Sequence, residues 1–169
     1  MTAADHHRPI VETRLLWRDE ADTAAFAQAL ARTFAQQPAP RDAYIELQGD
    51  LGAGKTTLVR HLLRALGVAG RIKSPTYAVV EPHDAAGLPV WHFDFYRFGD
   101  PREWEDAGLR DIFASPGLKI AEWPENAAAL VPIADLAIKI EADQDELRHV
   151  TLRAASARGQ ALLRGATTA

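Results

Sequence analysis

Eight consecutive residues of this chain have the types and spacing that hold a phosphate group. They are Gly49-Asp50-Leu51-Gly52-Ala53-Gly54-Lys55-Thr56, and they match the pattern of a glycine, four residues and Gly-Lys-Ser/Thr. Glycines let the backbone approach an anion closely and turn its N–H groups inward. Lys55 could then reach the β- and γ-phosphates of a nucleotide, and the Thr56 hydroxyl could ligate Mg²⁺. The alternative is a glycine-rich turn whose lysine is merely solvated.

The residues on either side of this loop favour the nucleotide-binding interpretation. Residues 43–47 before it read as a buried strand, and residues 57–66 after it read as a helix. Strand, glycine loop and helix is the context in which the motif binds phosphate. The start of the helix adds unpaired N–H donors and positive partial charge. The sequence therefore predicts a phosphate-binding loop (P-loop, or Walker A motif).

Two carboxylates could complete such a site, because a nucleoside triphosphatase needs one near its Mg²⁺. Asp94 lies within the predicted strand 88–97, and Glu122 ends the predicted strand 118–122. Spacing alone does not decide which of them ligates the metal directly and which supports the metal or orients water. The alternative for each is a carboxylate on an edge strand paired with an arginine, which for Asp94 would be Arg97.

The segment Lys73-Ser74-Pro75-Thr76-Tyr77 follows the predicted phosphate-site helix after a short loop. A loop with hydroxyl side chains at this place could sense the γ-phosphate, as a switch that the phosphate and its metal put in order. Thr76 carries the hydroxyl for that role. Plain turn chemistry before a strand is the competing interpretation.

Two aromatic residues near the carboxylates have less specific signals. His92 alternates with Trp91 and Phe93, so its side chain faces the opposite side of the strand. It could polarise a water, but we predict a structural histidine held by a hydrogen bond. Trp123 could stack on a base or a partner, and we predict that it packs in the core or at the rim instead.

The predicted elements place these residues in an α/β three-layer fold with a mixed parallel/antiparallel sheet, the P-loop NTPase class. Asp19 or Asp22 is expected to cap the first helix. Residues 76–81 and 88–97 are expected to form a hairpin around a turn at 83–87, and 124–130 a turn or short helix. The other strands are expected at 11–17, 43–47, 118–122, 134–141 and 146–155, and the helices at 19–37, 57–66, 101–113 and, briefly, after Ser156.

Composition limits the function classes. The chain has 169 residues, 47% hydrophobic and 25% charged, with a net charge of −4 and no cysteine. This is typical of one soluble domain and argues against broad electrostatic binding of nucleic acid, a disulfide framework or a thiolate metal site. We predict a disordered extension over residues 1–10, one domain over 11–165 and a tail over 166–169. Without a signal segment or a membrane-length apolar run, we expect a cytoplasmic protein with no membrane partner.

Four blocks in this order resemble one protein family. They are Gly49–Thr57, Ser74–Tyr77, His92–Arg97 (His-Phe-Asp-Phe-Tyr-Arg) and Glu122–Glu125 (Glu-Trp-Pro-Glu). Together they are similar to the bacterial TsaE (YjeE) family, the small ATPases of tRNA threonylcarbamoyladenosine biosynthesis. The resemblance covers roughly residues 12–163. One departure is Phe95, where the family more often has leucine, and this is a change in packing only.

The resemblance implies a slow, Mg²⁺-dependent ATPase that acts with two other proteins, TsaB and TsaD. In that system TsaD transfers the threonylcarbamoyl group to adenosine 37 (t6A37) of tRNAs that read ANN codons, and the ATPase supports the complex rather than performing the transfer. Contact with tRNA would be indirect, through the complex. By motif, Lys55 binds phosphates, Thr56 and Glu122 ligate Mg²⁺, Asp94 supports metal or water, and Thr76 lies in the switch. The residues expected to bind ATP are Gly49, Asp50, Leu51, Gly52, Ala53, Gly54, Lys55, Thr56 and Thr57.

Two other function classes compete with this one. A small-molecule or nucleotide kinase could share the P-loop, but it should also show an arginine-bearing lid and an acceptor pocket, and the chain has no compact arginine cluster. A non-enzymatic module whose nucleotide controls an interaction is the third possibility. The identity of the phosphoryl acceptor, water or a metabolite, separates the first class from the second.

Overall fold

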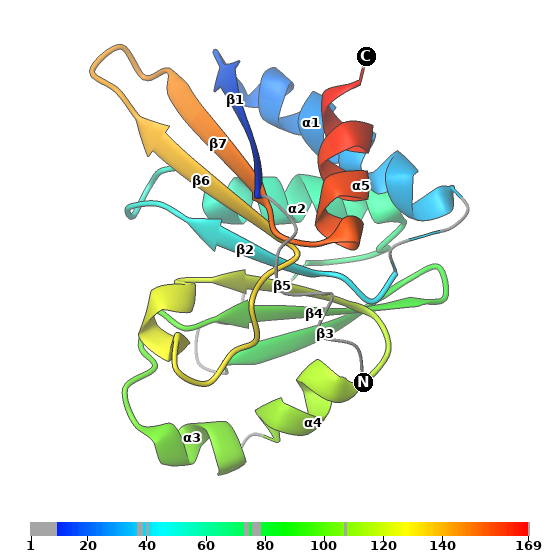
Figure 1. Cartoon of the computed structure of the whole chain (residues 1–169), viewed down its shortest axis with the longest axis vertical. Helices are drawn as coiled ribbons and strands as arrows, with labels where there is room; N and C mark the ends of the chain where they lie inside the picture. The colour runs from blue at the N-terminus through cyan, green and yellow to red at the C-terminus, as the bar shows by residue number, and fades with distance from the viewer. Residues whose placement is uncertain are drawn as a thin grey trace.

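A mixed sheet of seven strands forms the centre of the protein, in the order β1-β7-β6-β2-β5-β4-β3 (Figure 1). The computed structural model describes residues 10–36, 39, 41–72, 75, 79–106 and 108–168. Strands β4, β5, β2 and β6 run parallel to one another, whereas β1, β7 and β3 pair antiparallel with their neighbours. The predicted mixed α/β fold is confirmed. The strands are β1 (Val11–Trp17), β2 (Tyr44–Gln48), β3 (Val80–Ala85), β4 (Leu88–Asp94), β5 (Leu118–Glu122), β6 (Leu136–Ala142) and β7 (Arg148–Ala154).

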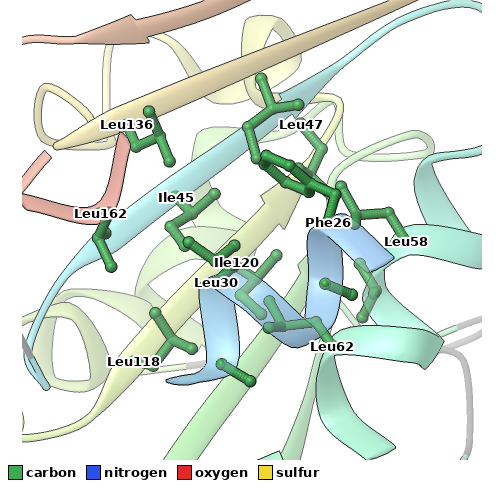
Figure 2. Packing of buried hydrophobic residues seen from close by; sticks show 14 of the residues in the cluster. Phe26, Leu30, Ile45, Leu47, Leu58, Leu62, Leu118, Ile120, Leu136 and Leu162 are labelled. Carbon is green, nitrogen blue, oxygen red and sulfur yellow. The ribbon is translucent and has the colours of Figure 1, made fainter. Parts of the chain in front are cut away.

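Three longer helices cover one face of the sheet (Figure 1). They are α1 (Glu20–Ala35), α2 (Lys55–Leu66) and α5 (Ala157–Thr167). Their apolar sides meet those of the central strands in the main core, where leucine and isoleucine side chains of β2, β5 and β6 pack against α1, α2 and α5 (Figure 2). Burial of this apolar surface is the dominant favourable term in folding, and here it fixes α2 against β2 on either side of the glycine loop.

The other face of the sheet has a smaller, aromatic core. Short helices α3 (Pro101–Asp106) and α4 (Leu109–Ala114) and the 3₁₀ turn η2 (Pro124–Ala127) pack over β2, β4 and β5. The rings of Phe93 and Phe113 stack with centroids 4.6 Å apart, and Tyr44 meets Phe113 edge-on at 5.0 Å. Strands β4 and β5 are therefore packed on both faces of the sheet, by the main core on one side and by the aromatic core on the other.

Several predicted boundaries were wrong for local reasons. The helix expected over 101–113 is two helices, because Gly108 adopts a left-handed φ of 65° before α4. The turn expected at 83–87 is only Ala86–Gly87, with φ of 52° and 93°, since two residues with positive φ suffice to close a hairpin. The strand expected over 88–97 ends at Asp94.

The ends of the helices also differ from the prediction. Asp19 caps α1, as predicted, by accepting the N–H of Asp22 at 3.1 Å. Helix α2 begins at Lys55, two residues earlier than predicted, so the P-loop lysine and threonine lie in its first turn. Helix α5 continues through Thr167, beyond the predicted start of the tail at 166. The extension over 1–9 lies outside the described residues, and the predicted domain bounds stay a prediction.

The topology brings the sequence motifs to one edge. The carboxyl ends of the parallel strands β2, β5 and β4 carry the glycine loop, Glu122 and Asp94, respectively. In open α/β sheets ligands bind beyond these carboxyl ends. Among the described residues, no helix is long and apolar enough to cross a membrane.

Candidate functional site

The loop between β2 and α2 has a backbone that depends on its glycines. Gly49, Gly52 and Gly54 adopt φ values of 148°, 79° and 111°, a region that side chains disfavour. At Gly49 a Cβ atom would also lie 2.5 Å from the carbonyl oxygen of Ile140 on β6. Gly49 is therefore needed for two reasons: its φ disfavours a side chain, and β6 leaves no room for a Cβ atom.

The lysine of the motif is held inside the loop. The Lys55 ammonium donates to the carbonyl oxygens of Gly49 and Asp50, the latter at 3.3 Å, and lies 3.8 Å from the centroid of the Trp123 ring. Burial lowers the pKa of Lys55, and carboxylates nearby, first among them Glu122, oppose that shift. The ammonium is therefore already at the loop and would exchange carbonyl partners for phosphate oxygens.

Thr56 and Glu122 meet across the gap between α2 and β5. The Thr56 hydroxyl donates a hydrogen bond to Glu122 Oε1, with the two oxygens 2.9 Å apart. In an octahedral Mg²⁺ site with bonds of about 2.0–2.1 Å, neighbouring ligand oxygens are separated by about 2.9 Å. The two oxygens thus have the spacing of two adjacent ligands, and both are of the oxygen type that Mg²⁺ prefers. The chemistry of this pair fits the predicted metal.

Asp94 lies beside Glu122 in the sheet, directly opposite it in the β4–β5 register. Its Oδ1 accepts the backbone N–H of Tyr96 at 2.9 Å, in the turn that ends β4. The alternative pairing with Arg97 is not among the ion pairs of the described residues. Burial raises the pKa of Asp94, and the neighbouring charge of Glu122 adds to that effect. The contact with Thr56 makes Glu122 the candidate for the direct ligand, and Asp94 Oδ2 would remain for a supporting role.

His92 is the residue whose role the sequence did not show. Its Nε2 lies 2.7 Å from Glu122 Oε2, and both side chains are almost completely buried. The predicted hydrogen bond of this histidine is confirmed, but its partner is the candidate metal ligand. The alternation of β4 was the available signal, because it puts His92 and Asp94 on the same face.

Trp123 forms one wall of the site, and its prediction as a packing residue was incomplete. It has a left-handed φ of 55°, which directs the chain into η2 and brings the ring beneath Lys55. The ring also packs against the Tyr96 ring, with the two ring centroids 5.0 Å apart. No sequence pattern signals a left-handed tryptophan.

Two of the cavities that touch the loop share Gly54 as part of their walls. One of about 230 Å³ is lined by the P-loop together with Asp94, Tyr96, Glu122 and Trp123. The other, of about 410 Å³, lies across Gly54. Its walls come from the junction of β1 and α1 and from the β6–β7 turn with Arg148. The predicted triphosphate and its metal would lie in the first, and the second has room for the rest of a nucleotide.

The structure thus brings together Lys55, Thr56, Asp94 and Glu122 around one cavity. Thr76 and its switch, apart from Pro75, lie outside the described residues. Within the described ranges, no group of three or more histidine, cysteine, aspartate or glutamate side chains could hold a metal by itself. Mg²⁺ at phosphate sites usually has one or two protein ligands, with phosphates and water completing the shell.

Comparison with known proteins agrees with the geometry. The family model described as "Threonylcarbamoyl adenosine biosynthesis protein TsaE" matches residues 17–150. A Haemophilus influenzae protein named tRNA threonylcarbamoyladenosine biosynthesis protein TsaE is 37% identical over 145 residues, covering 86% of this chain and 91% of the relative. A Bacillus subtilis protein of the same name is 34% identical over 151 residues, covering 88% and 91%.

A solved structure shows the same fold. The crystal structure of YdiB from Bacillus subtilis superimposes with a TM-score of 0.76 at 26% sequence identity, over 95% of this chain and 97% of that one.

Proposed function

The chain belongs to the TsaE family, and on that premise we propose that it binds and hydrolyses ATP in support of t6A37 formation in tRNAs that read ANN codons. In this proposal it works in the cytoplasm with TsaB and TsaD and does not itself transfer the threonylcarbamoyl group. Its contact with tRNA is indirect, through that complex. The names of the relatives support the pathway, and the site supports the ATPase.

The pairing of Thr56 with Glu122 beside the glycine loop is the observation that carries this proposal. The 2.9 Å contact sets an α2 hydroxyl and a β5 carboxylate oxygen side by side at the mouth of the P-loop. A generic glycine turn has no need of this pair, whereas Mg²⁺ bound with a nucleotide at a P-loop is typically held by a Ser/Thr hydroxyl and a nearby carboxylate.

Each residue then has a defined task. The loop N–H groups and Lys55 bind the phosphates, and Thr56 and Glu122 hold Mg²⁺. When bound, the metal neutralises charge on the β- and γ-phosphates. Asp94 has one oxygen fixed by the Tyr96 N–H and its second oxygen available to orient water, the phosphoryl acceptor in this proposal.

The charges of the site support a slow reaction that a partner accelerates. Of the described residues that line the 230 Å³ cavity, Lys55 is the one cation. Phosphoryl transfer needs positive charge from several sides, and an arginine supplied in trans can raise the rate by about 10³–10⁵. We propose that the TsaB–TsaD pair supplies such a group or aligns the site.

The test measures ATP hydrolysis by the protein alone and with the TsaB–TsaD pair from the same source. Strong stimulation is expected, and Lys55→Ala should abolish both binding and hydrolysis because the phosphates lose their cation. The γ-phosphate label should appear as inorganic phosphate. Its transfer to a metabolite would instead identify a kinase, and binding without any stimulation would identify a nucleotide-controlled module.

A further inference from the structure

The Glu122 carboxylate is held by a different partner on each of its two oxygens. Oε1 is 2.9 Å from the Thr56 hydroxyl, and Oε2 is 2.7 Å from Nε2 of His92. The side chains of His92 and Glu122 are only 2% and 3% exposed. One oxygen therefore faces the loop, and the other is turned back into the protein.

The sheet register explains how the ring reaches the carboxylate. Glu122 lies opposite Asp94, and His92 lies opposite Ile120, so His92 is the diagonal neighbour of Glu122 on the same face of the sheet. Side chains in this relation lie within reach of each other when one of them is long or aromatic. The ring thus approaches Glu122 from the interior, on the side away from the P-loop.

The hydrogen bond to Glu122 is the polar anchor of this ring. A carboxylate only accepts hydrogen bonds, so His92 Nε2 carries the proton in this bond. The other nitrogen, Nδ1, is buried and has no hydrogen-bond partner within the described part of the chain. Among the described residues, the contact with Glu122 is thus the one hydrogen bond of this buried ring.

We propose that His92 is a positioning residue that fixes the rotation of the Glu122 carboxylate, so that Oε1 stays beside Thr56 and ready for the metal. The inference rests on the proposed function, because it concerns Mg²⁺ bound with a nucleotide. Without the Nε2–H donor, Oε2 would lose its partner and the Glu122 carboxylate could rotate, which would move Oε1 away from Thr56. Such partners behind a metal ligand are typically worth about 10–100-fold in metal affinity.

Two substitutions separate positioning from mere packing. His92→Leu removes the donor, whereas His92→Gln keeps an N–H at nearly the same distance along the side chain. A packing role predicts that both variants lose stability and that neither changes the effect of Mg²⁺. A positioning role predicts that leucine weakens the effect of Mg²⁺ and that glutamine restores most of it.

The measurement is the affinity for ADP, with and without Mg²⁺, by calorimetry. This binding experiment needs no catalysis. In wild-type protein Mg²⁺ should tighten ADP binding. In His92→Leu the ratio of the two dissociation constants should shrink by about 10-fold or more, while affinity in EDTA stays near that of wild type. In a Glu122→Gln background, the leucine substitution should have no further effect on the ratio.

The outcomes distinguish this inference from the function on which it rests. If Mg²⁺ does not change ADP affinity in wild-type protein, the metal assignment of Thr56 and Glu122 fails, and this inference fails with it. If Mg²⁺ acts on wild type and equally on a folded His92→Leu variant, the inference alone is overturned.

A spectroscopic measurement on wild-type protein covers the case in which the leucine variant does not fold. The Nε2–H signal of His92, followed by NMR with ¹⁵N-labelled histidine and assigned through the glutamine variant, should persist in the complex with Mg²⁺ and ADP. Loss of that signal when the complex forms would overturn the inference, because the bond would then not hold the ligand in the bound state.

Discussion

Replacing Gly49 by alanine should destabilise the protein far more than the same change at Gly52. Gly49 has a φ of 148°, and an added Cβ would lie 2.5 Å from the Ile140 carbonyl oxygen and 3.2 Å from the Ala53 Cβ. Gly52 has a φ of 79°, and an added Cβ would meet nothing within 4 Å. Both positions strain the backbone, but only the first also forces the loop away from β6.

The magnitudes follow from these two contributions. A residue held in a sparsely populated φ/ψ region costs about 1–3 kcal/mol, and forcing extra carbon into a packed place costs a further 1–3 kcal/mol, roughly. Gly49→Ala should therefore lower the free energy of unfolding by about 4 kcal/mol, and Gly52→Ala by about 1–2 kcal/mol. At about 2–4 °C per kcal/mol for a chain of this size, the melting temperature falls by about 8–16 °C and 2–8 °C, respectively.

Urea denaturation and ADP calorimetry measure the two consequences. Gly49→Ala should also weaken ADP binding, because the displaced loop no longer directs its N–H groups inward. Gly117→Ala is the matched control: Gly117 has a φ of 116°, and its added Cβ would lie 2.4 Å from the Pro89 carbonyl oxygen, before β5 begins and so away from the site. This control should lose comparable stability and keep its affinity. A Gly49→Ala protein within about 0.5 kcal/mol of wild type would refute the reasoning, since ordinary surface substitutions have that effect.

Two further predictions concern stability. Burial, with a smaller effect of the Glu122 charge, raises the pKa of Asp94, so the carboxyl favours folding when protonated and this advantage is lost as the pH rises through the raised pKa. Asp94→Asn should therefore raise the melting temperature at pH 8 in EDTA, and this rise should shrink toward pH 4. ATP hydrolysis by the variant should fall. An equal rise at both pH values would show that the raised pKa of Asp94 is not the cause. Ser156 caps α5 by accepting the Gly159 N–H at 3.0 Å, so Ser156→Ala should cost about 1 kcal/mol in urea denaturation with no change in ADP affinity, and a change in affinity would show that α5 is coupled to the site.

The sequence predicted the parts of the site that depend on local order. The glycine loop, its strand and its helix are contiguous, so their spacing is visible in the chain. The sequence also predicted that Asp94 and Glu122 lie at the same edge of the sheet as the glycine loop, because each was placed on a predicted strand that leads to that edge. The blocks also identified the family, which the comparisons confirm.

The remaining features depend on contacts between distant segments. The choice of Glu122 over Asp94 rests on the β4–β5 register and on the placement of α2, neither of which a strand pattern contains. The His92 bond is a diagonal contact across that same register. The break at Gly108 and the left-handed Trp123 are single-residue backbone choices that tertiary packing decides, and local propensity is only a weak guide there.

The balance of charge in the phosphate cavity explains why the placement of Glu122 should matter so much. Three carboxylates, those of Asp50, Asp94 and Glu122, line the cavity with Lys55 as the one cation among its described residues. A nucleotide brings further negative charge, and like charges at short range repel strongly where water is excluded. In our proposal the bound metal relieves this repulsion, because it makes at least one of these carboxylates a ligand. In our proposal Glu122 can serve in this way because Thr56 and His92 each contact one of its oxygens and so fix the rotation of the carboxylate. The coupling between Mg²⁺ and nucleotide would then depend on His92, a side chain that touches neither.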